Sequence, residues 1–463
     1  MCEELKSMAA NKVWELVALP IGHKAVGSKW VFKTKRDSLG HIERHKARLV
    51  AKGFNQKEGI DYNETFSPVS KKDSLRIILA LVAHFDLELH QMDVKTAFLN
   101  GSLEEEVYMS QPEGFVEDGK EDLVCLLKKS IYGLKQASRQ WYIKFHDTIT
   151  AFGFTENLFD HCIYLKVSGS KFAFLVLYVD DILIASSDLS LLRETKSFLS
   201  SNFEMKDMGE ASFVLGIEIS RDRSQRTLGL SQKAYISKIL DRFNMTGCNS
   251  SIVPIQKEDK LSLKQCPKTD EEHKRMQDIP YASIVGSLMY AQVCTRPDIS
   301  FAVGVLGRYQ SNPGIEHWKV AKKVLRYLQG TKSHMLTYRH SDQLEVIGYT
   351  DSDFGGCEDS RKSTSGYVFV LAGGAISWRS AKQTIIASST MEVEFVACFE
   401  ATNHAVWLRN FISGLSVLSS IARLLRIFCD NTAAVFFSKN DKYSKGIKHM
   451  EMRFLSVKEE VRK

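Results

Sequence analysis

The feature that most constrains the fold is a pair of adjacent aspartates inside an apolar run. Residues 172–187 read FAFLVLYVDDILIASS, so Asp180 and Asp181 separate two β-prone segments, 172–179 and 182–187. Two apolar segments separated by two residues predict a β-hairpin. Two carboxylates within such a hairpin are costly unless another group compensates their charge. The pair therefore indicates a function at the tip of the hairpin. Because the two aspartates interrupt the apolar run, this segment cannot span a bilayer.

A third acid follows another predicted strand. Residues 74–85 (SLRIILALVAHF) have helical spacing, and residues 87–92 (LELHQM) then alternate up to Asp93. A sheet that joins these strand ends would place three carboxylates at one edge. Crowded like charges raise carboxyl pKa values, and divalent cations relieve the crowding. The pattern predicts a two-metal site for phosphoryl transfer. For Asp93 alone, a solvated acid at a strand end is the more common interpretation.

The composition supports a folded chain of several domains. The 463 residues predict two or three domains, and 44% hydrophobic with 25% charged residues exclude a disordered or low-complexity chain. Nine scattered cysteines without a C-x-x-C pair argue against a zinc finger or a disulfide framework. The amino terminus lacks the features of a signal peptide, so we expect an intracellular chain with no membrane role.

A basic hairpin is predicted near the amino terminus. Segments 29–36 and 44–52 alternate basic and apolar residues around a turn at 37–40. Between Lys29 and Lys52 there are eight basic residues and only two acids. This density suits phosphate binding, and a solvated hairpin face explains it equally well.

The carboxyl-terminal part predicts a second constellation of acids. Strands are expected at 344–351, 364–372 and 375–381, a helix at about 391–412 capped by Ser389 or Thr390, a strand at 426–430 and a helix from Asn431. In this β-β-β-α-β-α order, two strand ends and the start of the long helix gather Asp351, Glu394 and Asp430, which fits a two-metal hydrolytic site. Residues 246–340, which include an amphipathic helix at 317–331, are predicted to form a connector module between the two parts.

Several motifs together resemble the reverse transcriptase of copia-type long-terminal-repeat retrotransposons. They are KARLVAKGFNQKEGIDYNETFSPV at 46–69, HQMDVKTAFLNG at 90–101, KKSIYGLKQASRQWY at 128–142, YVDD at 178–181, MKDMGEASFVLGIEI at 205–219 and GSLMYAQVCTRPDISFAVG at 286–304. The resemblance continues through the carboxyl-terminal region and covers nearly the whole chain.

The resemblance implies an α+β fold. Right-hand polymerase fingers and palm and a connection segment would be followed by an RNase H-like α/β domain with a mixed sheet in β-β-β-α-β-α order. The implied domains are a lead-in at 1–27, fingers and palm at 28–245, thumb and connection at 246–340, and a carboxyl-terminally truncated RNase H-like domain at 341–463.

The resemblance also implies roles for residues of the polymerase part. The metal-binding catalytic acids would be Asp93, Asp180 and Asp181. The residues implied to contact the incoming nucleotide are Lys35, Lys46, Arg48, Phe98 and Gln136. Phe98 would exclude a ribose 2′-hydroxyl. The residues implied to contact nucleic acid are Lys33, Arg139 and Tyr178. Ordinary helix-surface positions remain the alternative for Gln136 and Arg139.

In the RNase H-like part, the resemblance implies metal ligands at Asp351, Glu394 and Asp430 and a fourth catalytic acid at Glu451. The family usually has aspartate where this chain has Glu451, and Val393 and Phe395 replace the alanine and tyrosine that usually flank the helix acid. Efficient RNA cleavage is therefore a weaker expectation than polymerisation. Asp353 and Glu392 are expected to be solvated or supporting acids.

The implied function is RNA-directed DNA synthesis coupled to cleavage of RNA in RNA–DNA hybrids. The cofactor would be Mg²⁺, two ions per active site, with Mn²⁺ able to substitute. The partners would be an RNA template, a DNA or RNA primer, the RNA–DNA hybrid and dNTPs, with no prediction of oligomeric state. The chain is expected to be a Pol polyprotein fragment, without the protease and integrase motifs, that works in cytoplasmic particles and whose DNA product enters the nucleus. Two alternatives are a decayed copy that binds nucleic acid without catalysis and a domesticated RNA-binding or structural protein.

Overall fold

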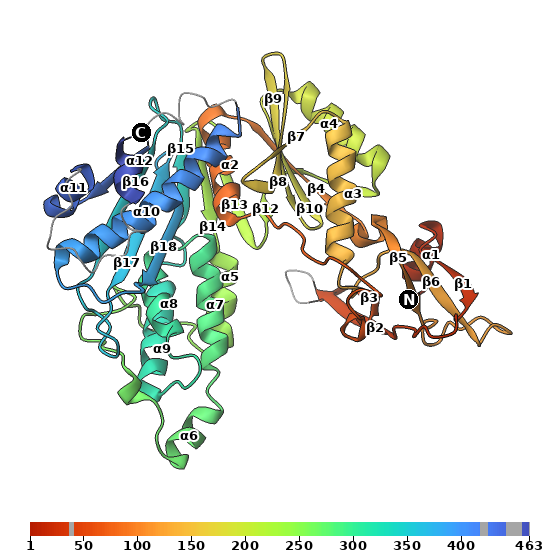
Figure 1. The fold of residues 1–463 in the computed structure, drawn as a ribbon, viewed down its shortest axis with the longest axis horizontal. Coiled ribbons are helices and arrows are strands. Elements are labelled where there is room, and N and C mark those ends of the chain that lie inside the picture. The colour runs from red at the N-terminus through yellow and green to blue at the C-terminus, as the bar shows by residue number, and fades with distance from the viewer. Residues whose placement is uncertain (37–40, 417–424, 441–455, 463) are drawn as a thin grey trace. The chain divides into compact units, whose positions relative to one another are not determined.

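The computed structural model describes residues 1–36, 41–416, 425–440 and 456–462 (Figure 1). The chain forms two compact units. The first unit comprises residues 1–70 and 88–210, and the second comprises residues 71–87 and 211–463. Each unit is described by itself below.

The first unit contains a six-stranded sheet in the order β11-β4-β10-β9-β8-β7, which we call the palm sheet after the palm that the resemblance implies. The bounds of these strands are β4 Glu88–Val94, β7 Thr155–Asn157, β8 Asp160–Ser168, β9 Lys171–Tyr178, β10 Asp181–Ser186 and β11 Met205–Glu210. Helices α3 (Ala137–Ala151) and α4 (Leu189–Asn202) cover one face of the sheet.

Strand alternation explains which palm residues enter this core. Met92, Val94, Ile182 and Ile184 pack under the helices, because residues two apart along a strand share a face. The intervening position, Asp93, belongs to the opposite face. The apolar pattern of the strands therefore fixes the face on which the acids appear.

The remaining part of the first unit, which we call the fingers part after the fingers that the resemblance implies, has its own core. It contains the sheet β1-β6-β5, the hairpin β2-β3 and helix α1. The bounds are α1 Cys2–Ala10, β1 Trp14–Ala18, β2 Ser28–Arg36, β3 Ile42–Ala51, β5 Ser102–Met109 and β6 Leu123–Lys129. The predicted basic hairpin is confirmed, although its turn at 37–40 lies outside the described residues. Met8 and Val13, which lie in the lead-in predicted at 1–27, are buried in this core.

Helix α2 (Lys72–Phe85) belongs to the second unit although the chain on both sides of it belongs to the first. Arg76, 3% exposed, holds it there. Its guanidinium donates to the carbonyls of Ile376 (2.8 Å) and Val293 (2.6 Å), and it lies 3.9 Å from the ring centroid of Trp378. It also pairs with Asp73 on the same helix. The predicted helix is confirmed, and its place in the second unit is a finding of the structure.

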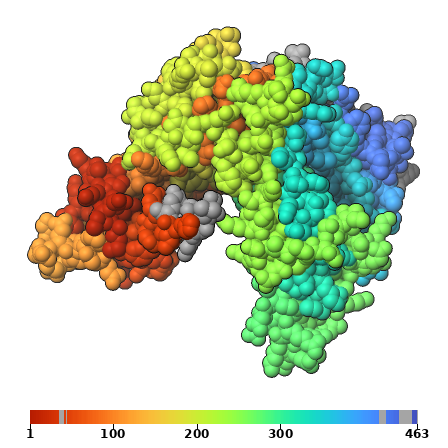
Figure 2. All heavy atoms as spheres, turned by 180° about the vertical axis from the view of Figure 1, so that it is seen from behind, coloured from red at the N-terminus to blue at the C-terminus, as the bar shows by residue number. Residues whose placement is uncertain are grey.

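The middle of the second unit is mainly helical. Its sheet has the order β12-β13-β14-β15, and the helices α5, α7, α8 and α9 share one apolar core. Figure 2 shows this part in green, with α6 at its far end. The bounds are β12 Phe213–Val214, β13 Ile217–Asp222, β14 Thr227–Ser231, α5 Lys233–Arg242, α6 Asp270–Gln277, α7 Tyr281–Cys294, α8 Ser300–Gly307, α9 Ile315–Gly330 and β15 Leu336–Arg339.

The carboxyl-terminal part of the second unit is a four-stranded sheet in the order β18-β17-β16-β19. Strand β19 runs parallel to β16, and the other neighbours are antiparallel. The bounds are β16 Val346–Ser352, β17 Thr364–Leu371, β18 Gly374–Lys382, α10 Thr390–Ser413, β19 Leu425–Cys429, α11 Thr432–Lys439 and α12 Ser456–Arg462. Ser389 caps α10 and Asn431 caps α11 through side-chain oxygens that accept backbone N–H groups.

The compact units do not follow the predicted domain ranges. Residues 211–245, predicted as palm, join the second unit through the pairing of β14 with β15. None of the described helices is long and apolar enough to cross a membrane.

Gly133 provides a test of the fingers core. It has φ +93°, and a Cβ there would lie 2.2 Å from the carbonyl oxygen of Ala51. The adjoining Tyr132 carbonyl accepts the backbone N–H of Ala51, so the backbone cannot move away freely. We predict that Gly133→Ala lowers the free energy of unfolding by about 2–3 kcal/mol, measured by urea denaturation.

Gly59→Ala is the matched control, since Gly59 has φ +77° with nothing within 4 Å of the added Cβ. It should cost only the conformational strain, about 1 kcal/mol. Equal losses in the two variants would show that the close approach at Gly133 does not matter.

Candidate active sites

The pairing of β4 with β10 brings the palm acids together. Asp93 and Asp181 are direct partners in this antiparallel register, so their side chains project from the same face. Asp180 lies in the turn before β10, and its carbonyl accepts the Val94 N–H at 2.9 Å. Asp181 is the first residue of β10, whereas the sequence predicted both aspartates at the hairpin tip. The three acids, far apart in the sequence, therefore lie at one edge of the palm sheet.

The turn that presents Asp180 is strained and anchored. Val179 has φ 56°, a left-handed conformation that costs a β-branched residue about 1–3 kcal/mol. The indole N–H of Trp141, from α3, donates to the Val179 carbonyl at 2.7 Å. Trp141 is 2% exposed, so the helix layer holds the strained turn in place.

The palm acids are electrostatically crowded. Burial raises the pKa of Asp180, and the carboxylates of Asp93 and Asp181 raise it further, while Arg48 and Lys46 oppose the shift. Burial and Asp93 also raise the pKa of Asp181, against a hydrogen bond from the Gln91 side chain at 2.9 Å. Asp180 Oδ1 is buried and accepts no hydrogen bond from any residue that the structure describes. A bound divalent cation would compensate this crowding of negative charge.

Basic residues of the fingers hairpin face the acids. Lys46 and Arg48 on β3 act electrostatically on Asp180. Lys33 lies directly opposite Lys46 in the β2-β3 register, and two like charges in that position repel each other unless an anion lies between them. Lys35 pairs with Arg44 through the backbone, and its side chain lies outside the described residues.

Two aromatic rings stand beside these groups. Phe98 is half-buried, and its ring centroid lies 5.1 Å from that of Tyr132. The Arg48 guanidinium lies 4.6 Å from the centroid of Tyr132. Burial raises the Tyr132 pKa to about 12, against the effect of Arg48, while Asp180 adds to the increase. Sequence reasoning missed Tyr132. Its place one residue before Gly133 in the IYGLKQ motif was the available signal.

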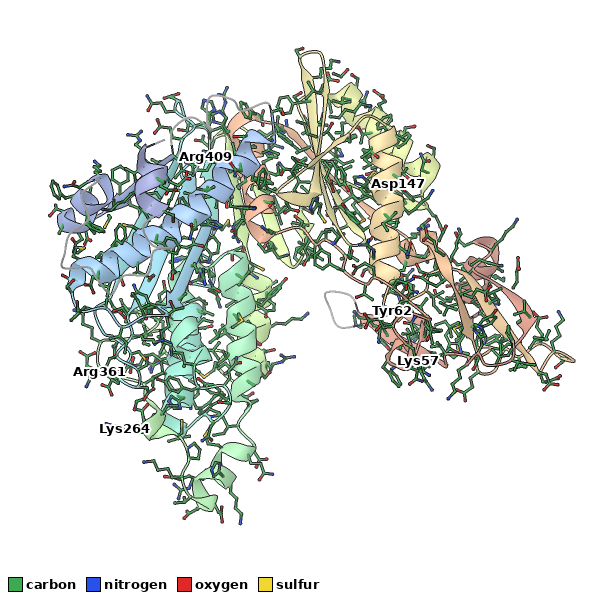
Figure 3. The ribbon with its side chains drawn as sticks, viewed as in Figure 1. Lys57, Tyr62, Asp147, Lys264, Arg361 and Arg409 are labelled. Carbon is green, nitrogen blue, oxygen red and sulfur yellow. The ribbon has the colours of Figure 1, made fainter. Side chains whose placement is uncertain are left out.

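Gln136 occupies a different environment from the one implied by the resemblance. It is fully buried, its amide oxygen accepts from Gln56 at 3.0 Å, and its amide nitrogen donates to the Asp61 carbonyl at 2.8 Å. These bonds fasten the loop that contains Lys57 and Tyr62, labelled in Figure 3. Gln136 therefore does not occupy an ordinary helix-surface position, and its contact with the nucleotide stays a prediction.

The two other predicted contacts with nucleic acid remain predictions. Arg139 donates to the Phe66 carbonyl at 3.0 Å, which ties α3 to the preceding loop. Tyr178 pairs with Asp181 across the β9-β10 hairpin and is half-buried. It therefore lies in the same cross-strand row as Asp181 and Asp93.

The second carboxylate cluster lies at the ends of β16 and β19. Glu394 is 7% exposed, and its Oε1 accepts the Ser352 N–H at 3.1 Å. One ligand atom each of Glu394, Cys429 and Asp430 lies within 4.8 Å of the others. Among the described residues, no other three ligand atoms of this kind lie so close together. Asp351 is not part of the group, and the three palm acids do not form such a group. The sequence predicted Glu394 and Asp430 here but did not predict Cys429.

Crowding shifts the titration of this second cluster. Burial, then the Cys429 sulfur, then Asp351 and Asp430 raise the Glu394 pKa to about 7, against the Ser352 N–H. A hydrogen bond from Cys398 lowers the Cys429 pKa to about 7. Asp351, although exposed, therefore acts on the same carboxyl group.

The two supporting acids have structural partners, as predicted. Asp353 accepts the Thr364 N–H, and Glu392 accepts hydrogen bonds from Ser388 at the start of α10. Glu451, the fourth predicted acid, lies outside the described residues.

Comparisons with known proteins agree with this geometry. Residues 11–257 match the family model described as reverse transcriptase (RNA-dependent DNA polymerase), which is more than half of the chain. The chain belongs to the reverse transcriptase family. Curated relatives that match the whole chain include transposon Pol polyproteins, which confirms the resemblance to copia-type elements.

The chain is 48% identical over its whole length to the retrovirus-related Pol polyprotein from transposon TNT 1-94 of Nicotiana tabacum, covering 34% of that protein. It is 37% identical to the Pol polyprotein from transposon RE1 of Arabidopsis thaliana, covering 31% of it. The putative transposon Ty5-1 protein of Saccharomyces cerevisiae is 34% identical over 67% of this chain and 98% of its own length. The chain thus spans about a third of the two Pol polyproteins.

Among solved structures, telomerase from Candida albicans in complex with a fragment of telomeric RNA matches 72% of this chain and 65% of its own. The sequence identity is 10% and the TM-score is 0.25. We base no argument on this match.

The raised Glu394 pKa gives a prediction about stability. An unfolded glutamate loses its proton near pH 4.5 and the folded one near pH 7, so the fold binds more protons between these values and loses stability as pH rises through them. Without divalent cations, Glu394→Gln should therefore raise the free energy of unfolding by about 2–3 kcal/mol at pH 8 relative to its effect at pH 4.5. Denaturant titrations at the two pH values measure this difference, and an effect independent of pH would contradict the assignment.

Proposed function

We propose that this chain is the RNA-directed DNA polymerase of a copia-type retrotransposon, using two-metal nucleotidyl transfer. The observation that carries the proposal is the register pairing of Asp93 with Asp181 beside the Asp180 turn. Membership in the reverse transcriptase family supports the same reaction.

The acids would hold two Mg²⁺ ions, with Mn²⁺ as a substitute. The raised pKa values of Asp180 and Asp181 and the unpartnered Asp180 Oδ1 support this fit. When bound, the ions would lower the energy of the attacking 3′-oxygen and of the leaving pyrophosphate. The chain contributes a strained, anchored turn that fixes where Asp180 presents its carboxylate.

The fingers residues would bind the other end of the nucleotide. Lys33, Lys46 and Arg48 carry positive charge next to the acids, and a triphosphate between them would relieve the repulsion of Lys33 and Lys46. The packed rings of Phe98 and Tyr132 would form the wall beside the sugar. A bulky ring there leaves no room for a 2′-hydroxyl, which would select deoxynucleotides over ribonucleotides.

Primer extension tests the polymerase proposal. On a poly(rA)–oligo(dT) substrate with Mg²⁺, we expect the wild type to incorporate dTTP. Asp181→Asn should reduce the rate by ~10²-fold or more, because it removes a charged ligand that acts on the transition state. Asp147→Asn is the control, since Asp147 is exposed on α3 away from the β4-β10 pair (Figure 3).

Equal extension by wild type and Asp181→Asn would contradict the palm assignment. Binding of the primer–template without any extension by the wild type would favour the decayed-copy alternative.

A sugar-selection assay tests the role of Phe98. Phe98→Ala opens the space beside Tyr132, so incorporation of rUTP relative to dTTP should rise by about 10-fold or more. The measurement is the ratio of kcat/KM values for the two nucleotides. Phe203→Ala, in the palm core, is the control for lost packing. An unchanged ratio in Phe98→Ala, or the same rise in Phe203→Ala, would contradict the proposed role of Phe98 in excluding the 2′-hydroxyl.

We further propose that the carboxyl-terminal sheet is an RNase H-like domain that cleaves RNA in RNA–DNA hybrids. The mixed sheet with β19 parallel to β16, and the acids at the ends of these strands, support the proposal. Asp351, Glu394, Asp430 and the acid predicted at Glu451 would hold the metals that activate the attacking water.

Hybrid cleavage by Glu394→Gln tests this second activity separately. The variant should lose cleavage by ~10²-fold or more and retain primer extension, because its carboxyl group belongs to the second cluster. Glu218→Gln, an exposed acid on β13, is the control that should keep both activities. Cleavage by Glu394→Gln at the wild-type rate would refute the assignment.

A further inference from the structure

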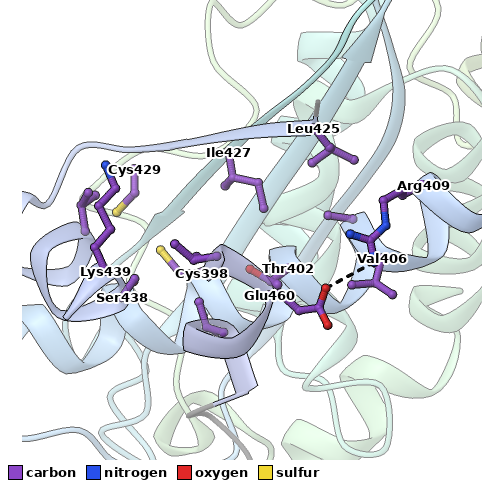
Figure 4. A pocket seen from close by; sticks show the side chains of 14 residues that line it. Cys398, Thr402, Val406, Arg409, Leu425, Ile427, Cys429, Ser438, Lys439 and Glu460 are labelled. Carbon is purple, nitrogen blue, oxygen red and sulfur yellow. Dashed lines mark hydrogen bonds and ion pairs between the residues drawn. The ribbon is translucent and has the colours of Figure 1, made fainter. Parts of the chain in front are cut away.

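Two thiols meet beside the second carboxylate cluster. Cys398 projects from α10 and Cys429 ends β19, and both line a pocket of about 400 Å³ (Figure 4). The Cys429 thiol donates a hydrogen bond to Glu394 Oε2 at 3.9 Å. Both cysteines are reduced in this structure. The thiol pair thus adjoins the acids of the proposed hydrolytic centre.

Cys429 also belongs to a set of potential metal ligands. Its sulfur, a Glu394 carboxylate oxygen and an Asp430 carboxylate oxygen all lie within 4.8 Å of one another. Glu394 is 93% buried, and the partner of its Oε2 in the described chain is the Cys429 sulfur at 3.9 Å. This buried oxygen therefore has a weak hydrogen bond where a cation would give a strong interaction.

We propose that Glu394, Cys429 and Asp430 form a binding site for a thiophilic divalent cation such as Zn²⁺ or Cd²⁺. Sulfur ligands select such ions, whereas Mg²⁺ prefers oxygen ligands alone. One sulfur and two carboxylates are three protein ligands, and a water molecule would complete the four-coordinate geometry that Zn²⁺ prefers. On binding, the Cys429 S–H bond breaks, the proton passes to solvent, and the sulfur lone pair forms the bond to the metal.

This site would regulate the second activity. An ion held by Cys429 occupies the carboxylates of Glu394 and Asp430, which the proposed hydrolytic centre also requires. Thiophilic ions should therefore inhibit hybrid cleavage while primer extension continues. This consequence rests on the proposed RNase H-like function, whereas the binding itself does not.

The test uses the full chain and Cd²⁺, whose bonds to thiolates absorb in the ultraviolet. In the presence of millimolar Mg²⁺, we expect the wild type to bind Cd²⁺ with a charge-transfer band that saturates at one equivalent. Cys429→Ser should lose the band and weaken binding by more than ~10-fold. Cys248→Ser, a half-exposed cysteine elsewhere in the second unit, should behave as the wild type.

Asp430→Asn provides a second variant that leaves the thiols and the buried positions intact, because Asp430 is exposed. It should retain the band and bind Cd²⁺ about 10-fold more weakly. The proposed metal site would be contradicted if the wild type showed no charge-transfer band with Cd²⁺, or if Cys429→Ser showed the same band as the wild type. Binding of Cd²⁺ by a wild type that never cleaves hybrids would instead overturn only the proposed RNase H-like function.

Discussion

The antiparallel pairing of β4 with β10 is the constraint on which the polymerase site depends. It places Asp93 directly opposite Asp181 and hydrogen-bonds the Asp180 carbonyl to Val94. A shift of one residue in this register would turn the acids toward the apolar core beneath α3 and α4. The burial of Met92 and Ile182 opposes that shift, so the same residues that stabilise the palm also position its charges.

The segment that leads into β4 adds a second constraint. Helix α2 packs in the second unit, where Arg76 donates to backbone carbonyls of β18 and α7. The chain then continues through Leu87 directly into the strand that carries Asp93. A buried guanidinium with several hydrogen bonds is costly to disrupt. Strand β4 of the first unit, which carries Asp93, is therefore covalently continuous with an element anchored in the second.

Local patterns in the sequence predicted most of the elements and the acids themselves. The two apolar segments around Asp180 and Asp181 predicted the β9-β10 hairpin. A cap at Ser389 or Thr390 and a helix start at Asn431 predicted where α10 and α11 begin. These features depend on residues that are close in the chain, so spacing and residue type suffice to predict them.

The features that the sequence did not predict depend on long-range packing. The burial of Gln136 against Gln56 and Asp61, the contact of Tyr132 with Phe98, and the place of Cys429 beside Glu394 join residues distant in the sequence. Neither periodicity nor residue type specifies such contacts. Tyr132 and Cys429 are the two site residues that the sequence did not predict. Each lies next to a residue of a predicted motif, and only the tertiary structure brings its side chain into the cluster.

The most direct test of the proposed metal site in the palm is Fe²⁺-directed backbone cleavage of the full chain. Fe²⁺ bound in place of Mg²⁺ generates radicals that cut nearby peptide bonds, and the cuts are mapped by mass spectrometry. The account predicts cuts near both Asp93 and Asp180, suppressed together by excess Mg²⁺ and by Asp181→Asn. Cuts near Asp180 that persist without any near Asp93 would show that the two strands do not share a cation, and the account of the palm would be wrong.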